Sequence, residues 1–383
     1  MTTAGISTKA LGAEPELLER KLLDDGWIEL FDGETLYGWK PRGEAEWEVA
    51  DGEVRTAGEK PGFLTSTTRW ADYVLHAEFK TPDATTNSGI FLRTPLEPKN
   101  PSSDCYELNI APRDNPFPTA SLVGRQKASL PEDKFPVAGQ WHSFEVTAEA
   151  GKITIVLDGE RVFEYGDESP VSIGHIGLQS REGPVAFRNI RLRPLGLQPL
   201  FNGRNLEGWS TERAEHSRFE VIDSGELQVL DGPGQIETER ELGDFVLQLD
   251  CKINGDGLNS GIFFRTLREG RWAGYESQLN NVFEGGDRTK PADFGTGGIY
   301  RRQPARRVVA DDHEWFTKTI VADGRHMAVW VEGYQVSDWT DERPPSKNAR
   351  EGFRAGPGVI AIQGHDPSTN LLFRNIRAAE LSH

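Results

Sequence analysis

The sequence predicts an all-β protein made of two similar antiparallel β-sandwiches in tandem, preceded by a short helix. The chain repeats itself at the length of a domain, and its apolar residues recur mainly with a period of two. The composition agrees, because 41 glycines and 23 prolines among 383 residues are typical of many short strands joined by turns.

The repeat is clearest in an eight-residue block that occurs twice. Asn-Ser-Gly-Ile-Phe-Leu-Arg-Thr begins at 87, and a copy with Phe for Leu begins 172 residues later, at 259 (259 − 87). A solenoid unit spans only about 20–50 residues, so the sequence indicates a duplicated domain. Other blocks recur in the same order: Leu-Phe-Asp/Asn-Gly with Leu-x-Gly-Trp at 30–39 and 200–209, Tyr-Glu at 106–107 and 275–276, and Phe-Arg-Asn-Ile-Arg at 187–191 and 373–377.

The elements follow from local patterns. Glu14–Asp24 has leucines at helical spacing and predicts the one amphipathic helix. In Phe245–Ile253, large apolar residues alternate with polar or smaller neighbours, which predicts a strand. Turn pairs such as Asp158-Gly159 close the expected hairpins. We therefore expect an N-terminal segment with the helix, a first sandwich and a second sandwich, at 1–24, 25–194 and 198–381.

Composition excludes several partners. A net charge of −17 and a pI near 5.0 argue against nucleic acid and against an anionic membrane surface. The chain contains no run of 18 or more apolar residues, the length that a helix needs to span a bilayer. The N-terminus lacks a signal-peptide core, which predicts a cytoplasmic protein, or a periplasmic or secreted one if a leader was removed. Cys105 and Cys251 occupy non-equivalent positions and are expected to be free, buried thiols.

Polar residues break the apolar pattern at equivalent strands of the two repeats. In Tyr-Glu-Leu-Asn-Ile, the alternation puts Glu107 and Asn109 on the face opposite to the apolar side chains. In the second repeat it puts Glu276 and Gln278 together in the same way. A carboxylate and a carboxamide are therefore expected side by side, away from the core, in both copies.

An arginine closes each Asn-Ser-Gly-Ile-Phe-x-Arg block. Arg93 and Arg265 have the opposite parity to Ile90 and Ile262, which should point into the core. We therefore expect an arginine, a glutamate and an amide on neighbouring strands to line one polar groove in each repeat. The alternative is a solvated sheet face with a surface ion pair, which contributes about 0–1 kcal/mol and which duplication would also copy.

Two histidines and a basic segment are further candidates. His175 lies in Gly-His-Ile-Gly-Leu-Gln-Ser and His365 in the related Ala-Ile-Gln-Gly-His-Asp-Pro, so both are candidates for the rim of the groove. Tyr300 and Arg301 open a basic segment that corresponds to the segment ending at Arg125 in the first repeat. This segment is either a solvated loop or part of a site for an anionic sugar or an enolate.

Standard glycoside hydrolysis is not supported by the sequence. A retaining glycosidase needs two carboxyl groups about 5–5.5 Å apart, whereas each repeat offers one obvious groove carboxylate. The chain also has no P-loop, no dinucleotide-binding Gly-x-Gly-x-x-Gly, no Gly-x-Ser-x-Gly elbow and no His-Glu-x-x-His.

Taken in order, these blocks resemble the bacterial 3-keto-disaccharide hydrolase domain family, whose fold is a concanavalin-like jelly-roll sandwich. The matching residues include the Gly-Leu-Gln of 177–179, and the resemblance, present in both repeats, extends over essentially all of residues 25–380. The resemblance implies two tandem concanavalin-like jelly-roll β-sandwiches. The chain departs from the usual form of the family in being a tandem and in lacking a visible export signal.

The resemblance also implies an activity, the cleavage of glycosides whose C3 hydroxyl has been oxidised to a ketone. The ketone acidifies the C2 proton, so that one base, Glu107 or Glu276, would remove it, and the aglycone would leave C1 by elimination, with or without hydration. Arg93 or Arg265 and the neighbouring amide would hold the enolate, and a groove histidine would protonate the leaving oxygen. A divalent metal could replace the arginine, although no ligand set in the sequence demands a metal or another cofactor.

Two other hypotheses stay open. A non-catalytic, lectin-like module would bind a sugar through the same groove, and two copies would give avidity. Alternatively, one copy is catalytic and the other supports it. Tyr275-Glu276-x-Gln278, followed by Gly-Gly-Ile-Tyr, is closer to the family's pattern than Tyr106-Glu107-x-Asn109, which favours the second copy. A sugar or glycoside is the expected partner, and the sequence indicates no oligomeric state.

Overall fold

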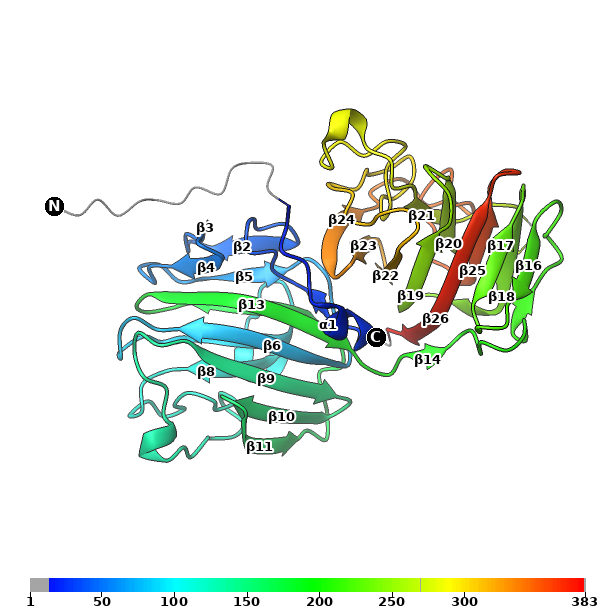
Figure 1. The fold of residues 1–383 in the computed structure, drawn as a ribbon. Helices are drawn as coiled ribbons and strands as arrows, with labels where there is room; N and C mark the ends of the chain where they lie inside the picture. Colours follow the sequence, from blue (N-terminus) through cyan, green and yellow to red (C-terminus); the bar gives the residue numbers. More distant parts are fainter. Residues whose placement is uncertain (1–13, 269, 382–383) are drawn as a thin grey trace.

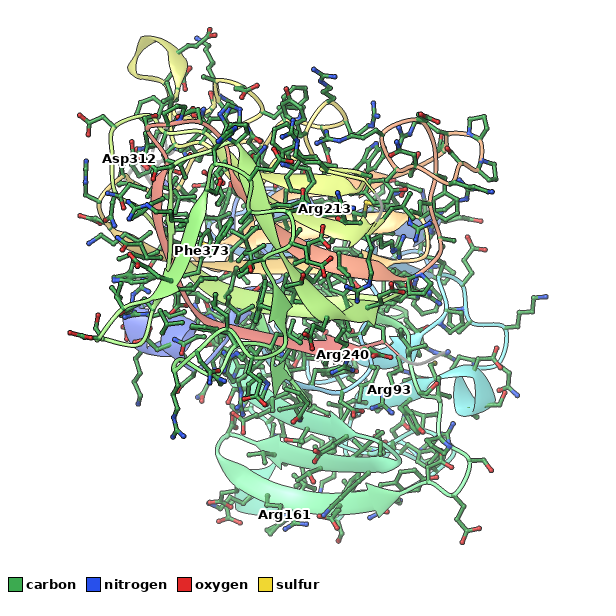
Figure 2. The ribbon with its side chains drawn as sticks, turned by 90° about the vertical axis from the view of Figure 1, so that its right-hand side faces the viewer. Arg93, Arg161, Arg213, Arg240, Asp312 and Phe373 are labelled. Carbon is green, nitrogen blue, oxygen red and sulfur yellow. The ribbon has the colours of Figure 1, made fainter. Side chains whose placement is uncertain are left out.

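The computed structural model describes residues 14–268 and 270–381, and these form two antiparallel β-sandwiches, one after the other along the chain (Figure 1). Each sandwich packs an eight-stranded sheet against a five-stranded sheet. The predicted all-β class with two tandem jelly-roll sandwiches is confirmed. Figure 2 views the pair from the side, with Arg161 at the outer end of the first sandwich and Phe373 in the second.

The first sandwich occupies the amino-terminal half of the chain. Its larger sheet has the order β11 (Glu160–Gly166), β10 (Lys152–Leu157), β9 (His142–Glu149), β6 (Tyr73–Lys80), β13 (Val185–Pro194), β4 (Glu53–Thr56) and β3 (Glu48–Ala50), with β1 (Ile28–Glu29) also paired to β13. Its smaller sheet has the order β2 (Trp39–Gly43), β5 (Gly62–Ser66), β12 (His175–Ser180), β7 (Ser88–Thr94) and β8 (Tyr106–Ile110). Its loops carry α2 (Pro101–Asp104) and the 3₁₀ turn η1 (Glu132–Lys134).

The second sandwich repeats this order of strands. Its larger sheet runs β16 (Arg218–Val221), β17 (Leu227–Leu230), β26 (Asn370–Glu380), β19 (Phe245–Ile253), β22 (Trp315–Asp323), β23 (His326–Val331) and β24 (Tyr334–Thr340), with β14 (Gln198–Pro199) paired to β26. Its smaller sheet runs β15 (Trp209–Ser210), β18 (Gly234–Leu242), β25 (Gly358–Gly364), β20 (Ser260–Thr266) and β21 (Tyr275–Leu279). The 3₁₀ turn η2 (Glu284–Gly286) follows β21.

The repeated tryptophan anchors the start of each sandwich. Trp39 and Trp209 are both 5% exposed. The indole Nε1 of Trp39 donates to Leu30 O at 2.6 Å, and that of Trp209 donates to Leu200 O at 2.7 Å. In each sandwich, the tryptophan of the Leu-x-Gly-Trp block thus binds the backbone of the Leu-Phe-x-Gly block, which explains why the two blocks recur together.

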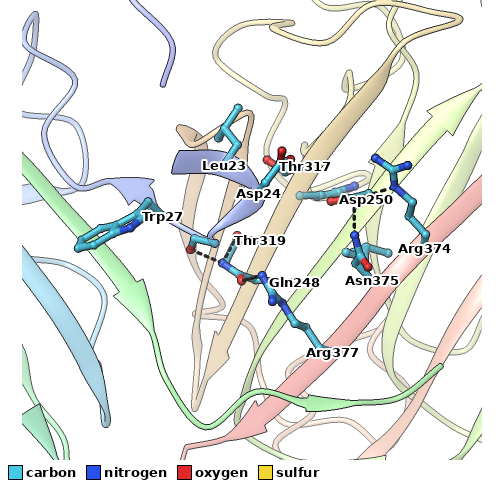
Figure 3. A pocket seen from close by; sticks show the side chains of 13 residues that line it. Leu23, Asp24, Trp27, Gln248, Asp250, Thr317, Thr319, Arg374, Asn375 and Arg377 are labelled. Carbon is cyan, nitrogen blue, oxygen red and sulfur yellow. Dashed lines mark hydrogen bonds and ion pairs between the residues drawn. The ribbon is translucent and has the colours of Figure 1, made fainter. Parts of the chain in front are cut away.

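The repeated Phe-Arg-Asn-Ile-Arg block forms a bulge in the last strand of each sandwich. Asn375 has a φ of 53°, in the left-handed region that asparagine tolerates better than most residues, and the register of β26 against β19 shifts there. Asp250 on β19 accepts hydrogen bonds from Arg374 and Asn375 at 3.0 and 2.7 Å (Figure 3). In the first sandwich, Glu78 binds the corresponding arginine and asparagine.

The predicted helix is shorter than its pattern. Of Glu14–Asp24, only Arg20–Asp24 is helical and forms α1, and the part of the expected segment before residue 14 lies outside the described residues. Leu18 and Leu23 pack over Gly333 of the second sandwich, and Glu14 lies 3.5 Å from Arg288. Residues 14–19 thus contact the second sandwich without being helical. In the described residues, no helix is long and apolar enough to cross a bilayer.

The two sandwiches are packed against each other. Trp70 and Trp330 meet at 5.7 Å between ring centroids, and Trp330 Nε1 donates to Glu29 O at 2.8 Å. Arg69 donates to both carboxylate oxygens of Asp323, at 2.6 and 2.5 Å. The contact combines buried aromatic area with a bidentate ion pair. Both cysteines are buried and unbridged, as predicted.

Candidate active site

A cavity of about 360 Å³ lies in the second sandwich, around the outward-facing residues of β20, β21 and β25. Its lining brings together five residues that the sequence predicted, from strands and loops far apart in the chain. These are Glu276, Gln278, Tyr300, Arg301 and His365, and the structure adds Asn259, Arg271, Trp272, Arg350 and Gln363.

Glu276 is the carboxylate of this cavity. It is 5% exposed, and Arg350 Nη2 donates to its Oε2 at 2.7 Å. Its other oxygen, Oε1, lies above Gly261 on β20, where a Cβ atom would come within 2.4 Å. Burial raises the pKa of Glu276, and the opposing effect of Arg350 does not cancel this. One oxygen is therefore bound by a cation, and the other accepts no hydrogen bond from the described residues.

Gln278 stands beside Glu276 on the same face, as the alternation predicts, and its amide is fixed. Its Nε2 donates to Asn259 Oδ1 at 3.0 Å and to Asp293 Oδ2 at 2.9 Å. Asn259 also donates to Asp293 at 2.8 Å. Asn259 is the first residue of the repeated Asn-Ser-Gly-Ile block, so one role of that asparagine here is to orient the amide of Gln278.

His365 lies at the edge of the cavity, immediately after β25. Its Nδ1 is 2.8 Å from Asp366 Oδ2, which places the proton on Nδ1 and leaves Nε2 without a partner among the described residues. The structure thus places His365 as expected, and Asp366 fixes its tautomer.

The wall holds two buried polar atoms without protein partners in the described part of the chain. They are the indole Nε1 of Trp272 and the Oε1 of Gln363. A buried polar group without a hydrogen bond is costly. Both atoms belong to residues that line the cavity, but each atom is itself closed off from solvent.

The expectation that Arg265 and Arg93 line the groove is wrong. Arg265 is fully buried and donates to Gly243 O, Gly324 O and Arg354 O at 3.0, 2.7 and 3.1 Å, with Asp244 as its ion-pair partner. Arg93 is 1% exposed and binds backbone carbonyls and Asp72 in the same way in the first sandwich.

A β-bulge explains why strand alternation predicted the wrong face for these two arginines. Arg265 has a φ of 49°, and the register between β20 and β25 shifts between Phe263 and Thr266. Arg93 has a φ of 51° at the end of β7. A bulge inserts one residue into the alternation, so the side chain that follows turns to the other face.

Arg350 takes the place beside the carboxylate that was expected for Arg265. It comes from the loop 341–357, which has 17 residues, whereas the corresponding loop of the first sandwich, 167–174, has 8. Arg302 donates to Arg350 O at 2.7 Å, and Arg265 holds the same loop through Arg354. In the sequence, the greater length of this loop in the second repeat is the feature that could have drawn attention to Arg350.

A buried lysine fastens β21 from the core side. Lys318 on β22 has no exposed surface, and its Nζ donates to Ser277 O and Gln278 O at 3.2 and 2.8 Å. Burial lowers the pKa of Lys318 to about 8. The strand that carries Glu276 is therefore held in place from both of its faces.

The first sandwich has a different arrangement at the equivalent face. Glu107 is 7% exposed and accepts a hydrogen bond from Gln179 Nε2 at 3.2 Å. Burial raises the pKa of Glu107 as well. Asn109 donates to Phe117 O. An amide, rather than an arginine, is therefore the donor that contacts this carboxylate in the described structure.

Two other candidates of the first sandwich lie elsewhere. His175 is 8% exposed at the start of β12, near Arg69 and Asp323 where the sandwiches meet, and burial lowers its pKa to about 4. Arg125 pairs with Asp167 at 2.8 Å and stacks on Tyr106, whose side chain has the opposite parity to Glu107. Neither residue lies at the position equivalent to its counterpart in the second sandwich. His175 begins β12, whereas His365 follows the end of the equivalent strand β25. Arg125 lies on the side of β8 that Tyr106 faces.

Comparison with known proteins places this geometry in a family. The family model for the 3-keto-alpha-glucoside-1,2-lyase-like domain matches residues 26–193 of this chain and, separately, residues 196–379. The chain belongs to this family. Both sandwiches are therefore 3-keto-alpha-glucoside-1,2-lyase-like domains.

Comparisons with individual proteins show more distant similarity. A 3-keto-disaccharide hydrolase of Bacteroides thetaiotaomicron is 26% identical over 246 residues, which is 48% of this chain and 83% of that protein. A protein of Parabacteroides distasonis described as a glycosyl hydrolase is 18% identical, with a TM-score of 0.41, covering 48% of this chain and all of that one. The carbohydrate-binding module CBM66 of Bacillus subtilis is 16% identical, with a TM-score of 0.34, covering 41% and 95%.

The two lyase-like domains differ at the wall of the cavity. The backbone bond from Tyr300 N to Glu276 O in the second domain corresponds to the bond from Val123 N to Glu107 O in the first. Tyr300 therefore stands where the first domain has valine, and Arg301 stands where it has Gly124. The aromatic and cationic wall beside the glutamate belongs to the second domain.

Proposed function

We propose that the cavity of the second domain cleaves 3-keto-glycosides by removing the C2 proton and eliminating the aglycone. The observation that carries this proposal is the buried Glu276 with Arg350 on one oxygen, in a cavity that His365 also lines. A single carboxylate suits this reaction, because the ketone at C3 makes the C2 proton acidic. The family and the named relative support the substrate class.

Glu276 is the base of the first step. Its Oε1 takes the C2 proton, and the electrons of the C–H bond form an enolate whose charge rests on O3. Arg350 stabilises this charge, since a preorganised guanidinium contributes most where negative charge develops. A base whose pKa is raised by burial is better matched to this task than an ordinary carboxylate.

His365 assists the second step. The enolate reforms the C3 ketone, a C1–C2 double bond appears, and the bond from C1 to the glycosidic oxygen breaks. Protonated His365 gives its Nε2 proton to that oxygen while Asp366 holds Nδ1. In the hydrolytic outcome, water then adds to C1 and a proton returns to C2.

Deuterium labelling tests the mechanism directly. The protein is expected to release the chromogenic aglycone from an aryl 3-keto-glucoside and to leave the unoxidised glucoside intact. In D₂O, the hydrolysed 3-keto-glucose should carry deuterium at C2, which mass spectrometry measures. Equal cleavage of the unoxidised glucoside, or a hydrolysed product without C2 label, would contradict the proposal. Binding of the sugar without cleavage would support the carbohydrate-binding alternative.

A glycine beside the carboxylate provides a second test. In Gly261→Ala, the new methyl group would meet Glu276 Oε1 at 2.4 Å and Cγ at 2.7 Å, so the carboxylate must move. We expect kcat to fall by about 10²-fold, because a displacement of about 1 Å costs that much in a positioned site.

Gly89→Ala is the matched control for this substitution. The same methyl group in the first domain would lie 3.4 Å from Glu107 Cγ, an ordinary contact, and 3.1 Å from Leu108 O. Steady-state kinetics of the two variants should therefore differ. Equal kcat values would show that the position of Glu276 does not limit turnover.

A further inference from the structure

One wall of the cavity is basic, although the chain carries a net charge of −17. Three arginines line the cavity, and Glu276 is the one carboxylate among the described lining residues. Arg350 is neutralised by Glu276, and Arg271 forms an ion pair with Glu215 outside the lining. Arg301 forms no ion pair with any residue that the structure describes, and its guanidinium lies 5.3 Å from the ring centroid of Tyr300.

The backbone at Arg301 is unfavourable for a side chain of this size. Its φ is 59°, in the left-handed region, and the corresponding residue of the first domain is Gly124 with a φ of 72°. Glycine adopts this conformation without steric cost, whereas a bulky L-residue does not. Trp272, also in the cavity wall, has a φ of 56°. Strained residues of this kind cluster where a side chain is needed for function.

The depth of the residues indicates which part of a ligand reaches Arg301. Glu276 is 5% exposed at the base of the cavity, whereas Arg301 is exposed. C1 is bonded to C2, so a leaving group on C1 lies next to the atom that Glu276 deprotonates, in the cavity that Arg301 also lines.

We infer that Arg301 binds an anionic group, such as a carboxylate, on the leaving group of the glycoside. This inference rests on the proposed function and specifies its substrate class. The anion would form a charge-assisted hydrogen bond with the guanidinium. Tyr300 would support it, since its ring already stacks with Arg301.

Two matched substrates test the inference. The 3-keto-glucosides of 4-carboxyphenol and 4-carbamoylphenol differ in charge and little in size. We expect the ratio of their kcat/KM values to fall about tenfold from the unmodified protein to Arg301→Gln, the scale of one charge-assisted hydrogen bond. Arg301→Lys should retain most of the ratio, and added salt should lower the ratio in the unmodified protein. Comparing ratios cancels the different leaving abilities of the two phenols.

Arg301→Gly separates recognition from folding. It restores the residue that the first domain has at this strained position, so this variant should fold and should lose the charge preference as Arg301→Gln does. A ratio that is the same in all variants would overturn the inference and leave the proposed function standing. A 3-keto-glucuronide of phenol carries the anion on the sugar instead, and a dependence on Arg301 only there would also overturn it. If no substrate is cleaved and calorimetry detects no binding of the unoxidised glucosides, the proposed function fails and the inference fails with it.

Discussion

The Glu276→Gln variant is expected to lose kcat on a 3-keto-glycoside by about 10²–10⁴-fold, the usual contribution of general acid–base catalysis. Glutamine keeps the shape of the side chain and can still contact Arg350, but it cannot accept the C2 proton. Because the interaction is needed along the reaction path rather than for binding, KM should change much less than kcat. Steady-state kinetics with a chromogenic 3-keto-glucoside measure both.

Glu107→Gln is the control for the choice of domain. Glu107 contacts an amide rather than an arginine, so this variant should retain the activity of the unmodified protein. If Glu107→Gln abolishes turnover and Glu276→Gln does not, the first domain holds the active site. If neither substitution changes turnover, neither glutamate is the base of the reaction.

The pH profile gives an independent signature of the base. Glu276 must be ionised to accept a proton, and burial raises its pKa. Activity should therefore fall as the pH is lowered, and the acidic limb of the kcat/KM profile should lie above the pH at which an ordinary glutamate carboxyl titrates. The raised pKa of Glu276 affects the stability of the fold in the opposite direction, since stability falls rather than rises with pH. The folded state holds this proton more tightly than the unfolded state, so the stabilising contribution of Glu276 is lost as the pH rises through its raised pKa.

The Arg265→Met variant is expected to lose about 3–5 kcal/mol of unfolding free energy, the usual cost of breaking a buried ion pair. Methionine fills part of the space but leaves three backbone carbonyls and Asp244 without the guanidinium. The loop 341–357 loses an anchor, so the position of Arg350 and hence kcat should suffer as well. Equilibrium unfolding in urea and steady-state kinetics together measure the two effects.

Arg93→Met separates the two effects. It removes the equivalent buried guanidinium from the first domain, with the same loss of carbonyl partners. We expect a similar loss of stability and no comparable loss of kcat, because Arg350 is held within the second domain. An Arg265→Met protein as stable as the unmodified one would contradict the structural role assigned to this arginine.

The duplicated β-sandwich and the glutamate–amide pairs on β8 and β21 could be predicted from the residue pattern. Both depend on the two-residue period of a strand, which is a local property that burial of one face enforces. Glu276 and Gln278 could be predicted for this reason. His365 is a candidate because its segment is related to the one that contains His175.

The cation that contacts Glu276 could not be predicted from the residue pattern, because long-range packing brings it there. Arg265 failed as a prediction because a bulge, invisible in the residue pattern, turns its side chain into the fold. Arg350 could not be predicted because it reaches the cavity from a loop 74 residues further along the chain. Such a contact depends on the path of the loop, which Arg265, Arg302 and Tyr275 fix by binding its backbone. Strand periodicity assigns a face to a side chain, but long-range packing assigns its neighbours.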